Sequence, residues 1–547
     1  MNYRLSAAEL DELAAYGERR RHEVGDVLFD EGDRSVDLCV VLSGQIDVFL
    51  YENDEVRRVG WLEPTQFTGD VSLITGRPSL VRGVMATAGD VLHVAPEALQ
   101  RLLVERSDLS DAFVTTFIAR RAWARAKGRA SVVLLGFAFD RDAFAIRDLL
   151  TKHDVPHLWV EADADPKAAT ILERLRLEPA DTPVLVTGSK TILKKPTLAE
   201  VSSALGLDLL PDGACADVIV IGAGPGGLAA AVYAASEGLT VLAVDGVAPG
   251  GQAGLSSKIE NYLGFPSGVS GRDLAERASV QAQKFGARIA TPARAAALDK
   301  IGADYCLSLA DGRKFRSRAV VIATGAEYRR LPIAECEQYE GRGIYYGATA
   351  MEGQLCKGST VVIVGAGNSA GQGAVFLSHL CQEVHVVYRR ADIRDTMSEY
   401  LVRRLEETAN IRLHPSSTVV GLDGDGRRLR AVRIGAENRK AIVEAPFLFL
   451  FLGASPSTQW LAPTLARDAK GFLKTGGDLA PVELVKAGWA LDRMPAQYET
   501  SWPRVYAVGD VRSGSVKRVA SSVGEGSAVV GGIHRALAET AAAPTAP

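Results

Sequence analysis

Hydrophobic and polar positions alternate in short runs through the first part of the chain. Apolar stretches at 37–42 and 45–50 are separated by Gly, Asn and Asp at intervals of roughly ten residues, which is typical of a β-sandwich or β-barrel. From Pro96 to about Ala126 the apolar positions follow helical spacing instead. They are Leu99, Leu102, Leu103, Leu109, Phe113 and Phe117. This region therefore predicts a β-barrel followed by a helical stretch.

The next region alternates strand-like and helix-like segments. Strands are predicted at 131–136, 158–160 and as a pair around 183–186, and helices at 142–153, 166–175 and 197–205. The order βαβαββα indicates a small α/β domain. Residues 207–214 contain Pro211-Asp212-Gly213 and are predicted to form a linker.

From Asp217 onward, an apolar strand runs into a glycine-rich loop and then a helix, and the same pattern recurs near residue 360. Such duplication predicts two nucleotide-binding βαβ units of the Rossmann-like type.

Composition narrows the class of protein. A chain of 547 residues is long enough for about three or four domains. Lys plus Arg is 62 and Asp plus Glu is 66, and 62 − 66 = −4, so the basic footprint of a nucleic-acid-binding protein is missing. The six cysteines include no pair separated by two residues and no Cys/His cluster, which excludes a C-x-x-C dithiol and a thiolate zinc site of ordinary spacing. We expect no metal.

The sequence also indicates the cellular compartment. The N-terminus lacks a cationic stretch followed by an apolar run, and the longest apolar run, 445–453, is too short to span a bilayer. We therefore expect a cytoplasmic protein without a membrane partner, and we expect 445–453 to form a buried strand.

The first glycine loop has the features of a dinucleotide site. The strand 217–221 leads into Gly222, Gly224 and Gly227, and the next strand ends in Asp245. Such glycines let the backbone turn tightly and approach a pyrophosphate at a helix N-terminus, and the acid accepts hydrogen bonds from a ribose diol. Further small and polar positions favour a flavin dinucleotide. They are Gly251, Gln252, Asn261, Thr324, Gly325, Gly509 and Asp510.

The second glycine loop carries cations where an NAD site would carry an acid. The strand 360–364 leads into Gly365, Gly367 and Ala370. The next strand is followed by Arg389, Arg390 and Arg394. Guanidinium groups there suit a 2′-phosphate, so the pattern predicts NADPH rather than NADH.

In this order, the motifs resemble the low-molecular-weight thioredoxin reductase family over about residues 215–540. The resemblance implies an FAD domain at 215–332 and 455–547, split around an NADPH domain at 333–454. It also implies that hydride passes from NADPH to FAD. The segment 517–521 would approach the flavin ring.

One departure leaves the electron acceptor open. Where the family carries C-A-T-C, this chain has Gly347-Ala348-Thr349-Ala350. Cys356, six residues beyond, is either a lone redox thiol or a buried structural cysteine. The acceptor could be a ferredoxin, a flavodoxin, a quinone, oxygen, or a protein disulfide reached through Cys356 or an external thiol. There are two alternatives to an enzyme. One is a flavoprotein that senses NADPH or redox state with slow turnover, and the other is a module that binds FAD without using it.

The first two regions resemble other families. Residues 1–128 resemble a cyclic-nucleotide-binding domain, with Gly69-Asp70 and Pro78-Ser79 in its phosphate cassette; the phosphate-binding Arg is missing there, although Arg82 lies nearby. This implies a cyclic-nucleotide site or, alternatively, a ligand-free regulatory or dimer-forming module, and we expect a homodimer.

Residues 129–208 resemble a thioredoxin- or glutaredoxin-like domain, with Thr182-Pro183 at the family's cis-proline position. The expected C-x-x-C is replaced by residues 136–140, so a docking or spacer role is implied. The predicted fold class is thus multidomain α/β: two Rossmann-like domains preceded by a β-barrel/helix domain and a thioredoxin-like domain.

Overall fold

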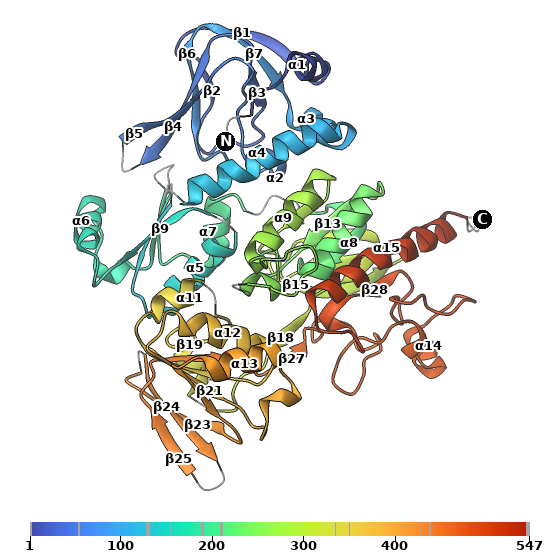
Figure 1. Ribbon diagram of the computed structural model, residues 1–547. Coiled ribbons are helices and arrows are strands. Elements are labelled where there is room, and N and C mark those ends of the chain that lie inside the picture. The colour runs from blue at the N-terminus through green and yellow to red at the C-terminus, as the bar shows by residue number, and fades with distance from the viewer. Residues whose placement is uncertain are drawn as a thin grey trace.

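The elements of the chain follow one another in the predicted order (Figure 1). The computed structural model describes residues 3–52, 55–126, 132–153, 155–187, 191–207, 210, 212–256, 258–333, 335–348, 350–426, 428–436 and 439–542. Thr349, the predicted domain boundary near residue 128 and part of the predicted linker at 207–214 lie outside the described residues.

The N-terminal unit, residues 3–126, is a pair of antiparallel sheets with the strand orders β1-β7-β3 and β2-β6-β4-β5. Its elements are α1 (Ala7–Leu13), β1 (Glu18–His22), β2 (Val27–Phe29), β3 (Leu38–Val41), β4 (Gln45–Glu52), β5 (Glu55–Leu62), α2 (Ser72–Thr75), β6 (Arg82–Thr87), β7 (Gly89–Val94), α3 (Pro96–Glu105) and α4 (Ser107–Ala126). The predicted helical stretch is two helices, because Arg106 has an extended backbone (φ −122°, ψ 91°). Its predicted apolar positions are buried, with Phe113 and Phe117 against Phe67.

The middle unit, residues 132–207, has the predicted βαβαββα order. Its elements are β8 (Val132–Gly136), α5 (Arg141–Lys152), β9 (His157–Glu161), α6 (Pro166–Leu175), β10 (Val184–Val186), β11 (Ile192–Lys194) and α7 (Leu198–Ala204). The sheet order is β11-β10-β8-β9, with β9 parallel and β10 antiparallel to β8. Each helix begins after a side-chain cap, at Asp140, Asp165 and Thr197.

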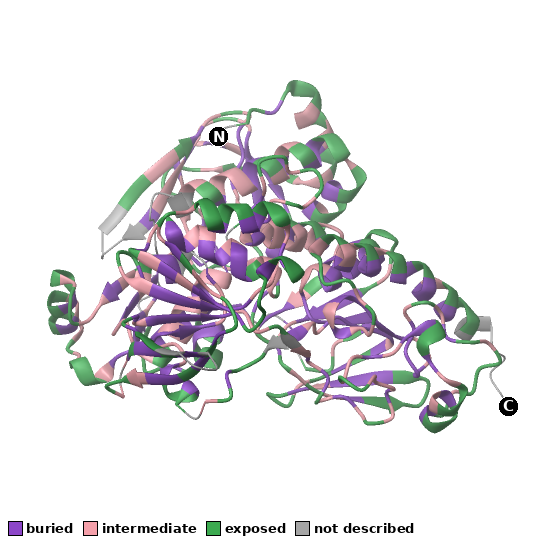
Figure 2. Ribbon diagram, turned by 60° about the horizontal axis from the view of Figure 1, so that its bottom comes forward, coloured by how far each residue is buried: buried purple, intermediate pink, exposed green. Residues whose placement is uncertain are grey.

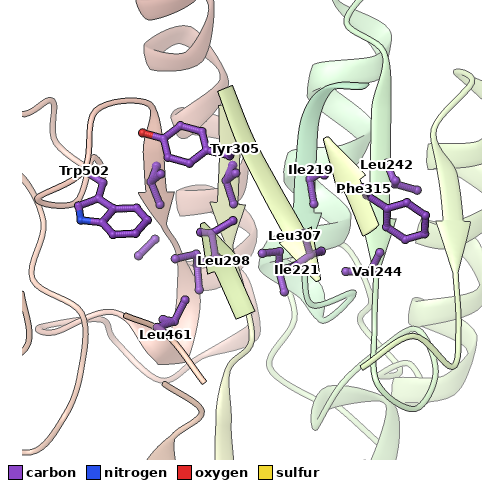
Figure 3. Close-up of a cluster of buried hydrophobic side chains, with 14 of the residues drawn as sticks. Ile219, Ile221, Leu242, Val244, Leu298, Tyr305, Leu307, Phe315, Leu461 and Trp502 are labelled. Carbon is purple, nitrogen blue, oxygen red and sulfur yellow. The ribbon is translucent and has the colours of Figure 1, made fainter. Parts of the chain in front are cut away.

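The first Rossmann unit comprises residues 212–328 and 454–542. Its elements are β12 (Cys215–Ile221), α8 (Pro225–Ser236), β13 (Val241–Val244), α9 (Gly271–Lys284), β14 (Arg288–Ala290), β15 (Ala295–Ile301), β16 (Asp304–Leu309), β17 (Lys314–Ile322), α14 (Pro481–Ala487), β28 (Val505–Ala507) and α15 (Val519–Ala542). β14, β13, β12, β17 and β28 are parallel neighbours in that order. Alternate residues of β12 enter opposite cores: Ile219 lies with Leu242 and Phe315 on one face (Figure 3), and Val220 lies on the other.

The second Rossmann unit, residues 335–453, is inserted into the first. Its elements are α10 (Cys336–Tyr339), β19 (Ile344–Tyr345), α11 (Ala350–Leu355), β20 (Thr360–Val364), α12 (Asn368–Ser378), β21 (Glu383–Val387), α13 (Glu399–Glu407), β22 (Ile411–His414), β23 (Thr418–Gly424), β24 (Leu429–Ala436), β25 (Arg439–Val443) and β26 (Phe447–Leu450). The parallel sheet has the order β19-β26-β20-β21-β22. The apolar run at 445–453 supplies β26, a buried strand as predicted.

Two chain segments link the Rossmann units. β18 (Ala326–Tyr328) leaves the first unit and β27 (Ala454–Pro456) returns to it, and the two strands pair antiparallel. Buried residues, purple in Figure 2, concentrate in the sheets of each unit. Within the described residues, none of the helices is long and apolar enough to cross a bilayer.

The N-terminal and middle units also contact the first Rossmann unit. Val280 of α9 belongs to the same buried cluster as the core of the N-terminal unit. The His153 ring, directly after α5, donates from Nε2 to the Val247 carbonyl (2.8 Å), and Arg77 donates to the carbonyl of His153 (2.5 Å). One residue therefore connects the middle unit to both neighbours.

His153 should make stability depend on pH. Burial, with Arg77 and Lys152 nearby, lowers the pKa of His153 to about 4, against 6.5 for the ordinary side chain. Because the unfolded chain takes up the proton first, the stabilisation is complete above pH 6.5 and is lost as the pH falls towards 4. Between pH 7 and pH 5 the loss should be about 2 kcal/mol. Urea unfolding of the wild type and His153→Gln at both pH values measures it; an equal pH dependence of the two proteins would contradict the expectation.

Candidate active site

The two glycine loops open into one cavity of about 1420 Å³. Its wall includes Gly224 and Asp245 of the first Rossmann unit and Gly367 of the second. Side chains of α2 and α5, from the N-terminal and middle units, complete the wall. The sequence predicts two separate sites, and the structure brings them together.

The first loop is shaped to admit a pyrophosphate. Gly222 has φ +105°, and a Cβ there would clash with the Ala323 carbonyl; a Cβ on Gly227 would clash with the Gly222 carbonyl. Gly224, by contrast, has room, because a Cβ there would have only the Cα of Gly251 within 4 Å, at 3.9 Å. Two glycines thus let the loop close on itself, and the third leaves room at the start of α8, where backbone N–H groups attract a phosphate.

Asp245 ends β13 at the edge of this cavity. Its carboxylate accepts hydrogen bonds from the N–H groups of Ala223 (2.8 Å) and Val247 (2.9 Å). Burial raises the pKa of Asp245, and those backbone donors oppose the shift. The residues present therefore fit the adenosine end of a flavin dinucleotide, with Asp245 held beside the glycine loop as the spacing predicts.

The Gly509-Asp510 turn lies on the same cavity. Gly509 has φ +71° and Asp510 lines the wall, where burial raises the pKa of its carboxyl group. Glu525 of α15, which the sequence analysis missed, accepts from the Gly509 N–H (2.6 Å) and from Arg512 (2.6 Å). It also accepts from Ser515 Oγ (3.0 Å), so a buried carboxylate organises the turn.

Other predicted flavin residues differ in their placement. Gly251, Gln252, Thr324 and Gly325 line the cavity, and the Gln252 amide donates to the Ala326 carbonyl. Asn261 is exposed and lies outside the lining residues. The structure therefore gives Asn261 no contact with this cavity.

The second loop repeats the steric pattern of the first. Gly365 has φ +151°, and a Cβ there would lie 2.6 Å from the Phe451 carbonyl, whereas Gly367 has nothing within 4 Å of that position. Gly367 and Ala370 line the cavity. A second dinucleotide can thus approach the start of α12.

The arginines after β21 lie on the surface beyond the cavity wall. Arg394 pairs with Glu406 (2.7 Å), and Arg390 lies 3.4 Å from Asp395. Because the Arg394 pair is the closer of the two, we expect Arg389 and Arg390 to be the more available cations for a 2′-phosphate.

Comparison with known proteins agrees with this geometry. The family model described as pyridine nucleotide-disulphide oxidoreductase matches residues 216–526, and that of the cyclic nucleotide-binding domain matches 19–106. The chain is 30% identical over 312 residues to a thioredoxin reductase of Listeria innocua, a match that covers 57% of this chain and 90% of that protein. The crystal structure of T. acidophilum thioredoxin reductase is 26% identical, with a TM-score of 0.52 over 59% of this chain and 98% of that one.

The chain belongs to the pyridine nucleotide-disulphide oxidoreductase family. Its N-terminal part is a cyclic nucleotide-binding domain by the same comparison. The predicted class of NADPH-dependent flavin oxidoreductase, the FAD and NADPH cofactors and the fold class of the Rossmann units are thereby confirmed. The thioredoxin-like identity of the middle unit and the exact domain boundaries stay predictions.

Cys356 of this oxidoreductase lies away from the cavity. Its side chain is fully buried, and its Sγ lies 3.4 Å from the Sγ of Cys381. The hydrogen bond with Cys381 and burial raise the pKa of Cys356. No cysteine is among the cavity-lining residues of the described chain. Of the two alternatives for Cys356, a lone redox thiol or a buried structural cysteine, its burial beside Cys381 favours the second.

The cassette of the cyclic nucleotide-binding domain is in contact with the domain's own last helix. Arg121 of α4 lies 3.3 Å from the Asp70 carboxylate and is almost fully buried. Arg120 donates to the carbonyls of Gly69 (2.8 Å) and Phe67 (2.9 Å). Asp70 of the cassette is thus already paired with a cation of its own domain.

Alanine substitutions at Gly224 and Gly367 should affect FAD binding and NADPH binding independently of each other. Gly224→Ala and Gly367→Ala each add a methyl group in open space, so both variants should fold. The methyl group of Gly224→Ala should weaken FAD binding by about tenfold or more, and that of Gly367→Ala should weaken NADPH binding similarly with FAD retained. Flavin absorbance after gel filtration and NADPH titration measure these effects. Full FAD content in Gly224→Ala, or unchanged NADPH affinity in Gly367→Ala, would contradict the assignment.

Proposed function

We propose that the protein is an NADPH-dependent flavin oxidoreductase that passes electrons from NADPH through FAD to an acceptor without a resident dithiol. The observation that carries this proposal is the single cavity onto which both glycine loops open, with no cysteine among its described lining residues. An acceptor that enters this cavity would meet the cofactors directly.

When bound, NADPH and FAD would supply hydride transfer and the delivery of two electrons to an acceptor. The chain itself contributes the groups that bind the cofactors. The loops at Gly224 and Gly367 admit two pyrophosphates, Asp245 and Asp510 offer carboxylates to hydroxyl groups, and Arg389 and Arg390 offer charge to a 2′-phosphate.

The acceptor is proposed to be a quinone or another small molecule, or a redox protein with a protruding group. A thioredoxin-type disulfide reached through Cys356 is the less favoured route, because that thiol is buried beside Cys381 and its raised pKa disfavours the reactive thiolate. We also propose that the protein acts as a cytoplasmic homodimer.

A sensing role is the second candidate. It is favoured by one observation: Val71, Ser72 and Thr75, in and beside α2 of the cyclic nucleotide-binding domain, line the cofactor cavity. Occupancy of the cavity could therefore act on that domain. Sustained turnover with an acceptor favours the enzyme, and a change of oligomeric state on flavin reduction without turnover favours the sensor.

The arginines and the acceptor can be tested together by anaerobic stopped-flow reduction. NADPH should reduce the flavin more efficiently than NADH. Arg389→Gln with Arg390→Gln should lower the NADPH efficiency by about tenfold or more and leave NADH unchanged, because each lost charge-assisted contact costs about 1.5–3 kcal/mol. Arg403→Gln, an exposed arginine paired with Glu399, is the control.

The reduced protein is then mixed with a small quinone, a ferredoxin, a flavodoxin and a thioredoxin. Reoxidation by the quinone should be equally fast in Cys356→Ser. Equal or better efficiency with NADH would refute the cofactor assignment, and thioredoxin reduction that is lost in Cys356→Ser would refute the dithiol-free route.

Cyclic nucleotides should not bind the N-terminal domain at micromolar concentration. Its cassette acid is paired with Arg121 and its Gly69 carbonyl with Arg120. Calorimetric titration of the intact protein with cAMP and cGMP should show no heat above dilution. Saturable binding in the micromolar range would contradict a ligand-free domain.

A further inference from the structure

Residues beside the two positions where the resembling families carry dithiols lie close together in this structure. The loop 137–140 precedes α5 in the middle unit, and Tyr345 stands two residues before Gly347 in the second Rossmann unit. The ring of Phe144 lies 5.2 Å from that of Tyr345, and the ring of Phe139 lies 6.4 Å from that of Phe447. Aromatic rings thus form this contact.

The contact is packed into the core of the second Rossmann unit. Phe139 and Phe144 lie against the buried cluster that contains Tyr345, Phe447 and Phe449. The Arg428 guanidinium lies over the Phe139 ring at 5.6 Å. Pairs of this kind stabilise beyond the area that they bury, so the N-terminal end of α5 is firmly joined to the second unit.

The other end of α5 is joined to the first Rossmann unit. His153 donates to the Val247 carbonyl at 2.8 Å, two residues beyond Asp245. Lys152 and His153 line the cavity, which places the end of the helix beside it. Figure 1 shows α5 at the junction of the units, next to α11.

One face of α5 forms part of the cavity wall between these two ends. Its lining residues recur at helical spacing and are Arg141, Phe144, Ala145, Asp148, Thr151 and Lys152. The opposite face, with Ile146, Leu149 and Leu150, packs in the core of the middle unit. The helix is therefore fixed in the middle unit, and a movement of one Rossmann unit relative to the other would disturb its contacts.

The direct links between the two Rossmann units do not by themselves fix their relative position. The chain passes between them through β18 and β27, and a partly exposed ion pair of Arg404 with Glu260 (3.0 Å) also joins them. Units joined in this way move relative to each other by default. The single cavity exists only while both glycine loops face it.

We propose that the loop 137–140 and α5 form an interdomain brace, in which Phe139, Phe144 and His153 are positioning residues that hold the two dinucleotide sites on one cavity. This inference rests on the proposed function, because its consequence is a fixed approach of NADPH to FAD. The middle unit thus acts as a permanent part of the reductase and is not a carrier of electrons.

Interdomain distances test the brace without reference to activity. Cys215 is exposed in the first unit whereas the other five cysteines are buried, and Val420, 49% exposed on β23, can be changed to Cys in the second. Spin labels at both sites should give one narrow distance distribution in otherwise wild-type holoenzyme. Phe139→Ala with Phe144→Ala should broaden it, and Phe137→Ala, in the same loop, should not. An unchanged distribution in the double variant would overturn the brace.

Kinetics test the positioning role. In the double variant the limiting rate of flavin reduction should fall by about tenfold or more, while FAD content and the NADPH concentration for half-maximal rate stay unchanged. Phe144→Tyr, which keeps the ring, should retain the wild-type rate, as should His153→Gln, whose amide can still donate to Val247. His153→Ala should lower the rate as a second variant with a milder packing change.

The outcomes separate this inference from the proposed function. If NADPH fails to reduce the wild-type flavin, the proposed function is wrong while the distance measurement still decides the brace. A broadened distribution with an unchanged limiting rate would overturn the positioning role of these residues.

Discussion

Close contact of backbone with backbone at the two glycine loops is the constraint on which the rest of the structure depends. At Gly222 and Gly365 a side chain would meet the carbonyl of a neighbouring strand end, so each loop closes only without one. The closure brings the starts of α8 and α12 towards the same cavity, with Gly224 and Gly367 facing open space. Steric exclusion at a few positions thus determines where two dinucleotides can approach.

The sequence predicts the local parts of this arrangement well. Strand, glycine loop and helix are contiguous, and Asp245 follows at the spacing that a βαβ unit requires, so both loops and the acid could be located from pattern alone. The order of strands and helices in the middle unit could be predicted in the same way, because strand-like and helix-like patterns of apolar residues alternate along it. The break at Arg106 was missed because helical spacing continues on both sides of it.

The contacts between distant segments could not be predicted. Glu525 organises the Gly509-Asp510 turn from α15, Cys381 lies beside Cys356, and Arg121 pairs with Asp70; in each case the partners are far apart in sequence and carry no local motif. The aromatic contact of Phe144 with Tyr345 belongs to the same class. In the part of the chain that the structure describes, the buried thiols lie outside the cavity lining, and aromatic packing joins the middle unit to the second Rossmann unit.

We propose that electrons pass from FAD to the acceptor without an intervening protein disulfide, and an anaerobic titration counts these electrons directly. Each NADPH delivers two electrons, which is the capacity of one FAD. We expect complete flavin reduction at one equivalent of NADPH per FAD, with the number of titratable thiols in the unfolded protein unchanged by reduction. A requirement for two equivalents together with the appearance of two new thiols would show a redox-active disulfide in the route and would contradict the account.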